Sequence, residues 1–368
     1  MNRLFVLCEN LDTRYGGPAY SVPSLLTGLS RGCDVEFHSI RWHTEESNGL
    51  LRNASWTVHP RTGPAKLGMS LPLWRHLWKV VDKADVVHLN NLWNAVALLA
   101  LLLRLFKGCS LIVSTRGGLQ SGALRTGRIR KWVAWAIFQK KCLLSATRVI
   151  AASSGEKAAI LSKIPDARVE VIENSIDIPD SSSIRCYESR PNRVLYLGRL
   201  HEHKRISMLL DLWASRESEF FDWELVFAGP DYGGYLPVIR SLEQHQIHYA
   251  GLVTGTEKAD LLNSAMLLVL PSKSENFGIV VAEALASAVP VLVTDTTPWG
   301  HLCDAGAGLA VAIESFEKQL FRLLRDRYLL STMSRRARAY ACENLGWRES
   351  RERYRLLLQA QYSVNSDH

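Results

Sequence analysis

Short apolar runs alternate with longer amphipathic stretches along the first half of the chain. The runs have the length of buried strands and lie at 4–8, 35–40, 86–89, 110–114 and 148–152. Between them, apolar residues at helical spacing predict helices at 20–30, 93–106 and 129–145. This alternation is typical of a parallel sheet that is covered by helices.

The same alternation resumes after a polar segment, Pro179–Ser183, whose proline and serines predict a domain boundary. Strands are predicted at 194–197, 223–228, 266–270 and 291–293, and helices at 206–214, 237–244 and 278–288. We therefore expect an α/β fold with two doubly wound, Rossmann-like domains at 1–180 and 181–346. A charged amphipathic helix at 347–362 is expected to cross back onto the first domain. Such domains bind ligands at the carboxyl ends of their strands, so the site is expected in a cleft between them.

The composition is that of a globular protein, with 47% hydrophobic and 22% charged residues among 368. The longest apolar stretch, Ala95–Leu103, is much shorter than the ~20 residues that span a bilayer. The start of the chain lacks the apolar core of a secretory signal. Seven cysteines are scattered without a C-x-x-C pair, so neither a disulfide framework nor a zinc site is expected. These features favour the reducing cytosol.

The strongest chemical signal is the segment Pro271–Pro290, an apolar strand end followed by a polar loop and an apolar helix. Glu275 precedes Gly278, where the first N–H groups of the helix are ready to donate to phosphate or sugar hydroxyls. Glu283 lies in the middle of that helix, where a carboxylate is costly unless something binds it. Paired ribose hydroxyls would satisfy it. The alternative is that Glu275 is solvated and Glu283 pairs with a core arginine.

A second segment, Val194–Lys204, is an apolar strand that ends at Gly198 and continues into a basic turn. Glycine allows the backbone to approach a ligand closely. Arg199 and Lys204 can then bracket a diphosphate, the first as a fork and the second as a point charge. The alternative is a solvated basic turn.

Together these segments resemble the GT4-type glycosyltransferases. The E-x7-E spacing from Glu275 to Glu283 is similar to the family signature, and Gly198 to Lys204 is similar to its G-R-x-x-x-x-K pattern. The resemblance implies a GT-B fold and a reaction that retains anomeric configuration. It places Glu275 at the donor sugar and Glu283 at the ribose, with Asn276, Phe277 and Gly278 beside them. Arg199 and Lys204 would stabilise the charge of the leaving nucleotide in place of a divalent metal, and no metal or other cofactor is expected.

Weaker similarities extend over nearly the whole chain. Gly16 and Gly17 resemble the family's N-terminal glycine loop, which implies donor contacts; alternatively, the two glycines form a simple turn. The segment 227–231 resembles the loop near the nucleotide base. The segments 88–93 and 114–119 resemble acceptor-side loops, so His88 and Arg116 are candidates for acceptor contacts; alternatively, His88 is a structural hydrogen-bonding group. Two departures are the loss of Pro-Asn-Gly at 172–177 and the presence of Arg205 where many relatives carry glycine.

Positive charge is concentrated in the first half of the chain. Residues 1–184 contain 23 Lys/Arg and 14 Asp/Glu, whereas residues 185–368 contain 21 and 22, against a net charge of +8 overall. Cations interleave with aromatic residues around the predicted helix 129–145, namely Arg125, Arg128, Arg130, Lys131, Lys140 and Lys141 with Trp132, Trp135 and Phe138. Such a helix either buries its aromatic stripe in its own domain or docks on an anionic membrane. Nucleic acid ranks last, because no recognition module is present.

The leading hypothesis is transfer of a hexose from a nucleoside-diphosphate sugar, UDP- slightly favoured over GDP-, to a membrane-linked glycan in O-antigen or exopolysaccharide assembly. The enzyme would be cytoplasmic and peripheral on the inner face of the membrane. The alternative is a catalytically silent module that binds nucleotide sugars or anionic membranes. No G-x-G-x-x-G follows the first strand, which disfavours a dinucleotide dehydrogenase.

Overall fold

The computed structural model describes residues 3–12, 17–29, 33–42, 48–64, 67–120, 123–124, 127–215 and 218–366. The chain divides into two compact units. The first is formed by Met1–Ser175 together with Trp347–His368, and the second by Ile176–Gly346. Gly16 and Arg125, two residues with predicted roles, lie outside the described ranges.

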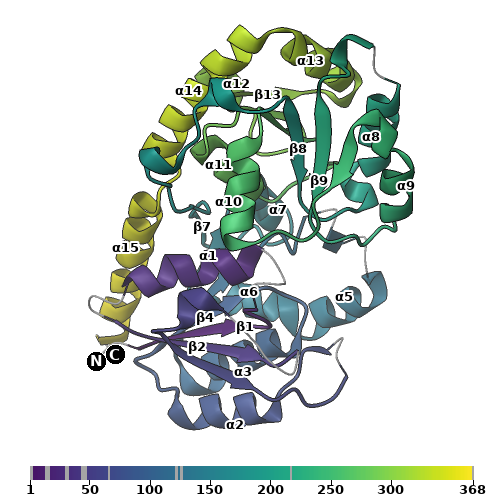
Figure 1. The fold of residues 1–368 in the computed structure, drawn as a ribbon. Helices are drawn as coiled ribbons and strands as arrows, with labels where there is room; N and C mark the ends of the chain where they lie inside the picture. Colours follow the sequence, from purple (N-terminus) through teal and green to yellow (C-terminus); the bar gives the residue numbers. More distant parts are fainter. Residues whose placement is uncertain are drawn as a thin grey trace. The chain divides into compact units, whose positions relative to one another are not determined.

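Seven described strands form an all-parallel sheet in the first unit, in the order β3-β2-β1-β4-β5-β6-β7 (Figure 1). They are β1 (Arg3–Cys8), β2 (Asp34–Ile40), β3 (Ser55–His59), β4 (Val86–Asn90), β5 (Ser110–Ser114), β6 (Arg148–Ala151) and β7 (Val169–Val171). The helices are α1 (Gly17–Leu26), α2 (Leu71–Val80), α3 (Ala95–Lys107), α5 (Arg128–Ala134), α6 (Lys140–Ser145), α7 (Ser154–Leu161) and α15 (Trp347–Ser366).

Alternate residues of the central strands build separate hydrophobic cores on the two faces of this sheet, as expected for strands whose side chains alternate in direction. Phe5 and Leu7 of β1 pack with α2 and α3, whereas Leu4 and Val6 pack with α1 and α15. Tyr354 of α15 is fully buried in the second of these cores. The C-terminal helix is therefore an integral part of the first unit.

The second unit contains a sheet of six described strands, also all parallel, in the order β10-β9-β8-β11-β12-β13. These are β8 (Arg193–Leu197), β9 (Glu224–Ala228), β10 (Ile247–Tyr249), β11 (Leu267–Leu270), β12 (Val291–Thr294) and β13 (Gly308–Val311). The helices are α8 (Ile206–Ala214), α9 (Leu236–Ser241), α10 (Gly255–Ser264), α11 (Ile279–Ala286), α12 (Leu302–Ala305), α13 (Ile313–Arg325) and α14 (Arg327–Asn344). One continuous hydrophobic core holds them together.

The boundary between the units lies at Ser175 and Ile176, a few residues before the polar segment that predicts it. Ile176 is buried in the core of the second unit and forms a parallel bridge with Gly346. The bridge therefore joins the residue at which the chain enters the second unit to the residue at which it leaves that unit. The polar residues 179–183 follow the entry point and belong to the second unit.

The predicted helix at 129–145 is interrupted. Its middle turn, Trp135–Gln139, is π-helical and lies between α5 and α6. A π turn inserts an extra residue into the helix and rotates the side chains that follow it. Within the described part of the chain, none of the helices combines the length and apolar character needed to cross a membrane.

Candidate functional site

Two loops of the second unit meet where the strand order reverses. Gly198 follows β8 and Ser272 follows β11, and these two strands are neighbours in the sheet. Ligands of doubly wound sheets bind at such a switch point, beyond the carboxyl ends of the strands. The topology therefore brings together the basic turn and the loop that contains Glu275, which are far apart in sequence.

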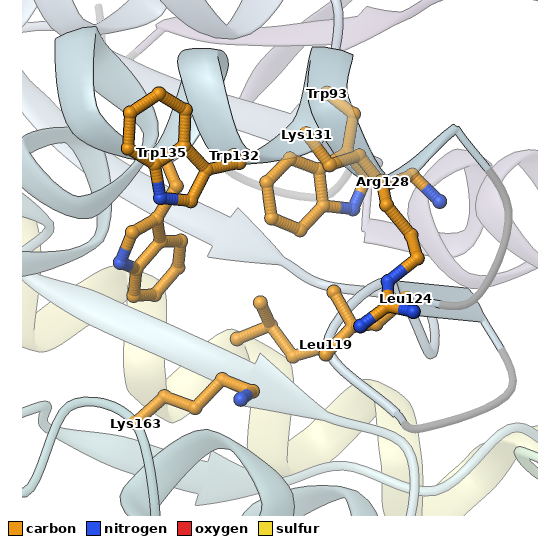
Figure 2. Close-up of a pocket in the computed structure, with 8 residues that line it drawn as sticks. All are labelled: Trp93, Leu119, Leu124, Arg128, Lys131, Trp132, Trp135 and Lys163. Carbon is orange, nitrogen blue, oxygen red and sulfur yellow. The ribbon is translucent and has the colours of Figure 1, made fainter.

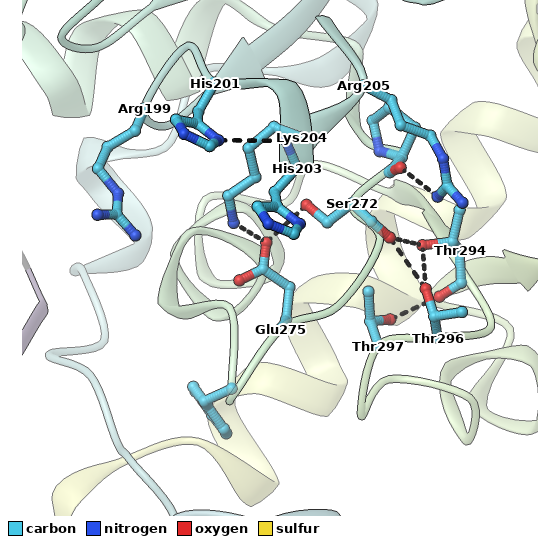
Figure 3. Close-up of polar contacts among 12 residues, drawn as sticks. Arg199, His201, His203, Lys204, Arg205, Ser272, Glu275, Thr294, Thr296 and Thr297 are labelled. Carbon is cyan, nitrogen blue, oxygen red and sulfur yellow. Dashed lines mark hydrogen bonds and ion pairs between the residues drawn. The ribbon is translucent and has the colours of Figure 1, made fainter. Parts of the chain in front are cut away.

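Lys204 and Glu275 form an ion pair across these two loops (Figure 3). Both side chains are largely buried, with 16% of Lys204 and 12% of Glu275 exposed. The hydroxyl of Ser272 donates to the same carboxylate oxygen at 2.7 Å. Glu275 is therefore not simply solvated: a cation and a hydroxyl fix its carboxylate at the edge of the sheet.

Arg199 is exposed and extends separately from the Lys204–Glu275 pair (Figure 3). Its backbone carbonyl accepts a hydrogen bond of 2.9 Å from the hydroxyl of Tyr196. Burial first, and then the nearby Glu275 carboxylate, raises the pKa of Tyr196, so this hydroxyl stays protonated and keeps its donor role. The backbone of the turn is thus anchored while the guanidinium faces solvent.

Arg205 adopts a left-handed backbone conformation, with φ of 54°. This conformation favours glycine, which explains why glycine is common at this position in the family that the sequence resembles. The guanidinium of Arg205 donates to the carbonyl of Pro271 at 2.8 Å. The arginine therefore ties the basic turn to the loop after β11.

Threonines at the end of β12 and just after it hold the same loop from its other side. The hydroxyls of Thr294 and Thr296 both donate to the carbonyl of Ser272, at 2.6 and 2.9 Å (Figure 3). This support was not predicted from the sequence, although the run Thr294–Thr297 directly after an apolar strand is a usable signal.

Glu283 lies on α11, with 16% of its side chain exposed. Its Oε1 atom accepts a hydrogen bond of 2.5 Å from Lys258 of α10, not from a core arginine. Its Oε2 atom is buried and has no hydrogen-bond partner among the described residues. A buried carboxylate oxygen without a donor is costly, so this atom is suited to accept from a ligand hydroxyl.

Gly278 directly precedes α11 with φ of 77°, a conformation that glycine adopts at little cost. Phe277 is buried against Trp299, with ring centroids 4.9 Å apart, and its carbonyl accepts a hydrogen bond from the indole N–H. Phe277 therefore anchors the start of the helix. Asn276 lies between it and Glu275 and is half-buried.

Arg116 lies at a small pocket of the first unit, beyond the end of β5. Its guanidinium donates to Asn174 at 2.8 Å and to Asn90 at 3.2 and 3.3 Å. Asn174 belongs to the segment 172–177, which lacks the Pro-Asn-Gly of many relatives. The segment nevertheless provides a hydrogen-bond partner for Arg116. Gly17 begins α1, whose Ser21 is also within reach of Arg116, at 3.3 Å.

A buried carboxylate that was missed from the sequence orders the loop around Arg116. Glu156 of α7 is fully buried and accepts from the hydroxyl of Thr115 at 2.5 Å, the N–H of Ala152 at 2.7 Å and the N–H of Gly117. Three donors compensate the burial of one charge. In the sequence, Glu156 appears only as an ordinary residue of the first turn of a helix.

His88 is fully buried in the first unit and both of its ring nitrogens are hydrogen-bonded. Nε2 pairs with the hydroxyl of Ser114 at 2.8 Å, and Nδ1 with that of Tyr354 at 2.7 Å. This environment favours the structural role for His88 over contact with an acceptor. Burial, followed by the charge of Arg116, lowers the pKa of His88 to about 3.

The low pKa predicts a pH dependence of stability. Because the folded pKa is about 3 and the unfolded value about 6.5, the unfolded chain binds one more proton between these pH values, and stability falls as the pH is lowered. Between pH 7 and pH 5, this ring alone lowers the free energy of unfolding by about 2 kcal/mol. The free energy of unfolding should be measured with urea at both pH values. Its decrease from pH 7 to pH 5 should be about 2 kcal/mol smaller in His88→Gln than in the unmodified protein. Equal losses would contradict the assignment.

The interrupted helix α5–α6 contributes to a second pocket of the first unit, of about 320 Å³ (Figure 2). Its lining combines cations with aromatic and aliphatic side chains: Trp93, Leu119, Leu124, Arg128, Lys131, Trp132, Trp135 and Lys163. The aromatic residues of the helix differ in burial. Trp135 and Phe138 pack against the core of the unit, whereas Trp132 is 72% exposed.

Solved structures identify the class of protein that these two units define. The chain superposes on sucrose-phosphate synthase from Thermosynechococcus elongatus with a TM-score of 0.80, covering 99% of this chain and 100% of that one at 16% identity. It superposes on WaaG, a glycosyltransferase involved in lipopolysaccharide biosynthesis, with a TM-score of 0.71, covering 97% and 99% at 16% identity. The fold is GT-B, as predicted from the sequence.

Sequence comparison gives the family. The model of Glycosyltransferase Family 4 matches residues 15–179, and that of Glycosyl transferases group 1 matches residues 184–340. The chain therefore belongs to the GT4 family of retaining glycosyltransferases.

Two individual relatives have low sequence identity to this chain, and the similarity covers only part of each relative. A GDP-mannose:cellobiosyl-diphosphopolyprenol alpha-mannosyltransferase of Xanthomonas campestris is 26% identical over 238 residues, which span 63% of this chain and 61% of the relative. A phosphatidyl-myo-inositol mannosyltransferase of Mycobacterium leprae is 30% identical over 180 residues, 42% of this chain and 47% of the relative. The chain thus spans less than two thirds of the length of either.

Proposed function

We propose that the chain transfers a hexose from a nucleoside-diphosphate sugar to a glycan that is linked to a membrane lipid. The observation that carries this proposal is the Lys204–Glu275 pair at the switch point of the second sheet. A largely buried cation and a largely buried carboxylate at this position can hold the two halves of such a donor, its diphosphate and its sugar.

Each residue has a distinct task in the proposed reaction. As the bond between the anomeric carbon of the hexose and the diphosphate breaks, its electrons leave with the nucleotide, and Lys204 and Arg199 stabilise the growing negative charge. An acceptor hydroxyl bonds to the same carbon and gives its proton to the departing diphosphate. Glu275 accepts hydrogen bonds from the sugar and holds it in place. The free Oε2 atom of Glu283 accepts from a ribose hydroxyl, while the hydrogen bond from Lys258 to Oε1 orients the carboxylate.

The donor that we propose is GDP-mannose, in place of the UDP-sugar expected from the sequence, and the name of the Xanthomonas relative supports this choice. Incubation with a panel of UDP- and GDP-sugars tests the function: slow release of nucleoside diphosphate marks the enzyme, and Glu275→Ala is the control for background hydrolysis. Binding of donors without release of nucleoside diphosphate would favour the silent binding module. The absence of both binding and release would overturn the proposal.

Turnover is expected to survive chelation by EDTA. Arg199 and Lys204 take the place of a metal at the diphosphate, so the donor needs no bridging cation. Nucleoside diphosphate release should be measured before and after dialysis against EDTA, at a temperature well below unfolding. Loss of turnover that added Mg²⁺ or Mn²⁺ restores would contradict this clamp.

The acceptor proposed is a glycan on a lipid diphosphate, the class named for the Xanthomonas relative, in assembly of an O-antigen or exopolysaccharide. The pocket beside α5 is chemically suited to an amphipathic anion. Arg128, Lys131 and Lys163 supply positive charge, and Trp93 and Trp132 supply apolar surface. Arg116, whose guanidinium is oriented by two asparagines, is the second candidate for contact with the acceptor.

We further propose that the first unit docks on the inner face of the cytoplasmic membrane through the α5–α6 helix. Three of its apolar side chains are strongly exposed: Ile129 at 82%, Trp132 at 72% and Ile137 at 62%. Exposed cations flank them, and this combination is typical of helices that lie in a membrane interface.

Charge reversal should release the protein from anionic vesicles. Changing Arg128, Arg130 and Lys140 to Glu is expected to weaken binding about 100-fold or more, because each cation near the surface contributes about 1 kcal/mol. Lys131 is left unchanged, since its ammonium donates to the carbonyl of Ala123 at 2.5 Å and supports the local fold. The matched control reverses Lys318, Arg322 and Arg335, all exposed in the second unit. Equal sedimentation of both variants with vesicles at low salt would contradict the membrane proposal.

A further inference from the structure

Four polar side chains gather on one face of the first sheet, at the strands farthest from β7. Glu36 and His38 are two residues apart on β2 and therefore point to the same face. His76 comes from α2, and His59 from the end of β3. The donor atoms of Glu36, His38 and His76 all lie within 4.8 Å of one another.

One atom of this cluster is buried without a partner. The ring of His38 is 1% exposed, and its Nε2 atom has no hydrogen-bond partner among the described residues. The nearest carboxylate oxygen, Oε2 of Glu36, lies 3.7 Å away, which is too far for a hydrogen bond. It is close to the separation of about 3.4 Å between two ligands of a tetrahedral ion with bonds of 2.1 Å.

The other nitrogen of His38 is already oriented. Its Nδ1 atom lies 3.1 Å from Nε2 of His59, which is itself buried. With His38 donating through Nδ1–H, the lone pair of Nε2 points into the cluster. Histidines that bind metals usually donate their second N–H to such a partner, which fixes the tautomer and the ring.

We propose that Glu36, His38 and His76 bind a divalent transition-metal ion, with zinc the best match, and that His59 orients His38. Two imidazoles and a carboxylate form a ligand set that zinc accepts, leaving one position for water. This site uses no cysteine, which is why the scattered cysteines gave no sign of it.

The position of the ligands defines what the ion would do. Glu36 and His38 lie within β2 and not at its carboxyl end, and all the ligands belong to the first unit, whereas Lys204 and Glu275 belong to the second. The ion would join β2 to α2 and clamp this helix onto the sheet. We therefore expect binding to raise the melting temperature and to leave donor turnover unchanged.

The test uses full-length protein without a histidine tag, dialysed against EDTA and titrated with Co²⁺ and then Zn²⁺. Expected results are one ion per chain, a visible Co²⁺ absorption band that Zn²⁺ removes, and a melting temperature about 5–10 °C higher at 100 times the dissociation constant. His76→Ala and Glu36→Gln change residues that are not fully buried, and each should weaken binding about 100-fold. His59→Ala should weaken it about 10–100-fold. His245→Ala, in the second unit, should have no effect.

Absence of saturable binding, or unchanged affinity in both His76→Ala and Glu36→Gln, would overturn the proposal. His38→Ala is not the primary variant, because truncation of so buried a ring can itself unfold the unit. Far-ultraviolet circular dichroism of each metal-free variant should match that of the unmodified protein, so that loss of binding is separated from loss of fold.

Discussion

Glu275→Ala is expected to lower donor turnover about 10²–10³-fold, an effect of the size seen when one stabilising contact to a transition state is removed. The carboxylate is fixed by Lys204 and Ser272, and it is the group assigned to the transferred sugar. The free nucleoside diphosphate lacks the transferred hexose, so its binding should be nearly unchanged. It should become slightly tighter if it changes at all, because the variant frees Lys204 from its ion pair.

Initial rates of nucleoside diphosphate release and calorimetric titration with the free nucleotide measure the two effects separately. Glu202→Ala is a matched control: it removes an exposed carboxylate from the same basic turn, where Glu202 pairs with Lys273 at 2.9 Å. It should change neither quantity. A loss of nucleotide affinity as large as the loss of turnover in Glu275→Ala would mean that Glu275 has been assigned to the wrong part of the donor.

Glu283→Gln is expected to weaken binding of the free nucleoside diphosphate about 10–100-fold. A hydrogen bond to a charged group contributes about 1.5–3 kcal/mol, and the amide replaces one carboxylate oxygen with an NH₂ group that cannot accept from a hydroxyl. The variant also removes the ion pair with Lys258, which is 29% exposed and can turn to solvent. The effect should therefore be on affinity more than on stability.

Titration with the nucleoside diphosphate and with its 2′,3′-dideoxy analogue tests this role. The variant and the unmodified protein should bind the analogue with equal affinity, because the analogue lacks the ribose hydroxyls that Glu283 is proposed to bind. Glu257→Gln, an exposed glutamate of α10, serves as the control. If Glu283→Gln binds both nucleotides normally, the free oxygen of Glu283 does not contact the ribose.

The central strands of both sheets were predictable because they are fully buried and read as unbroken apolar runs. β1 and β8 are examples, and the switch point between β8 and β11 follows from the order of the strands. The four edge strands, β3, β7, β10 and β13, were missed because they are short and only partly buried. Edge strands of this kind depend on pairing with a neighbour more than on their own sequence.

The positions of the residues proposed to bind the sugar donor were predictable for a different reason. Each of them follows an apolar strand whose end is visible in the sequence as a change to polar residues. Their partners were not. Lys258 reaches Glu283 from another helix, and Tyr354 reaches His88 from a segment more than 260 residues later. The cluster of Glu36, His38 and His76 depends in the same way on strand pairing and on the packing of α2. Its only local signal was the spacing of Glu36 and His38 on one face of a strand.

The membership of α15 in the first unit has a consequence for the order in which the chain can fold during synthesis. Tyr354, Leu357 and Leu358 complete a core whose other members, such as Leu4 and Val6, leave the ribosome first. Every residue of the second unit emerges before Trp347. The second unit can therefore reach its native contacts while one face of the first sheet is covered by α1 but not yet by α15. A nascent chain stalled before Trp347 exposes Val6, Val22 and Leu26 to chaperones, and only release of the last helix closes that surface.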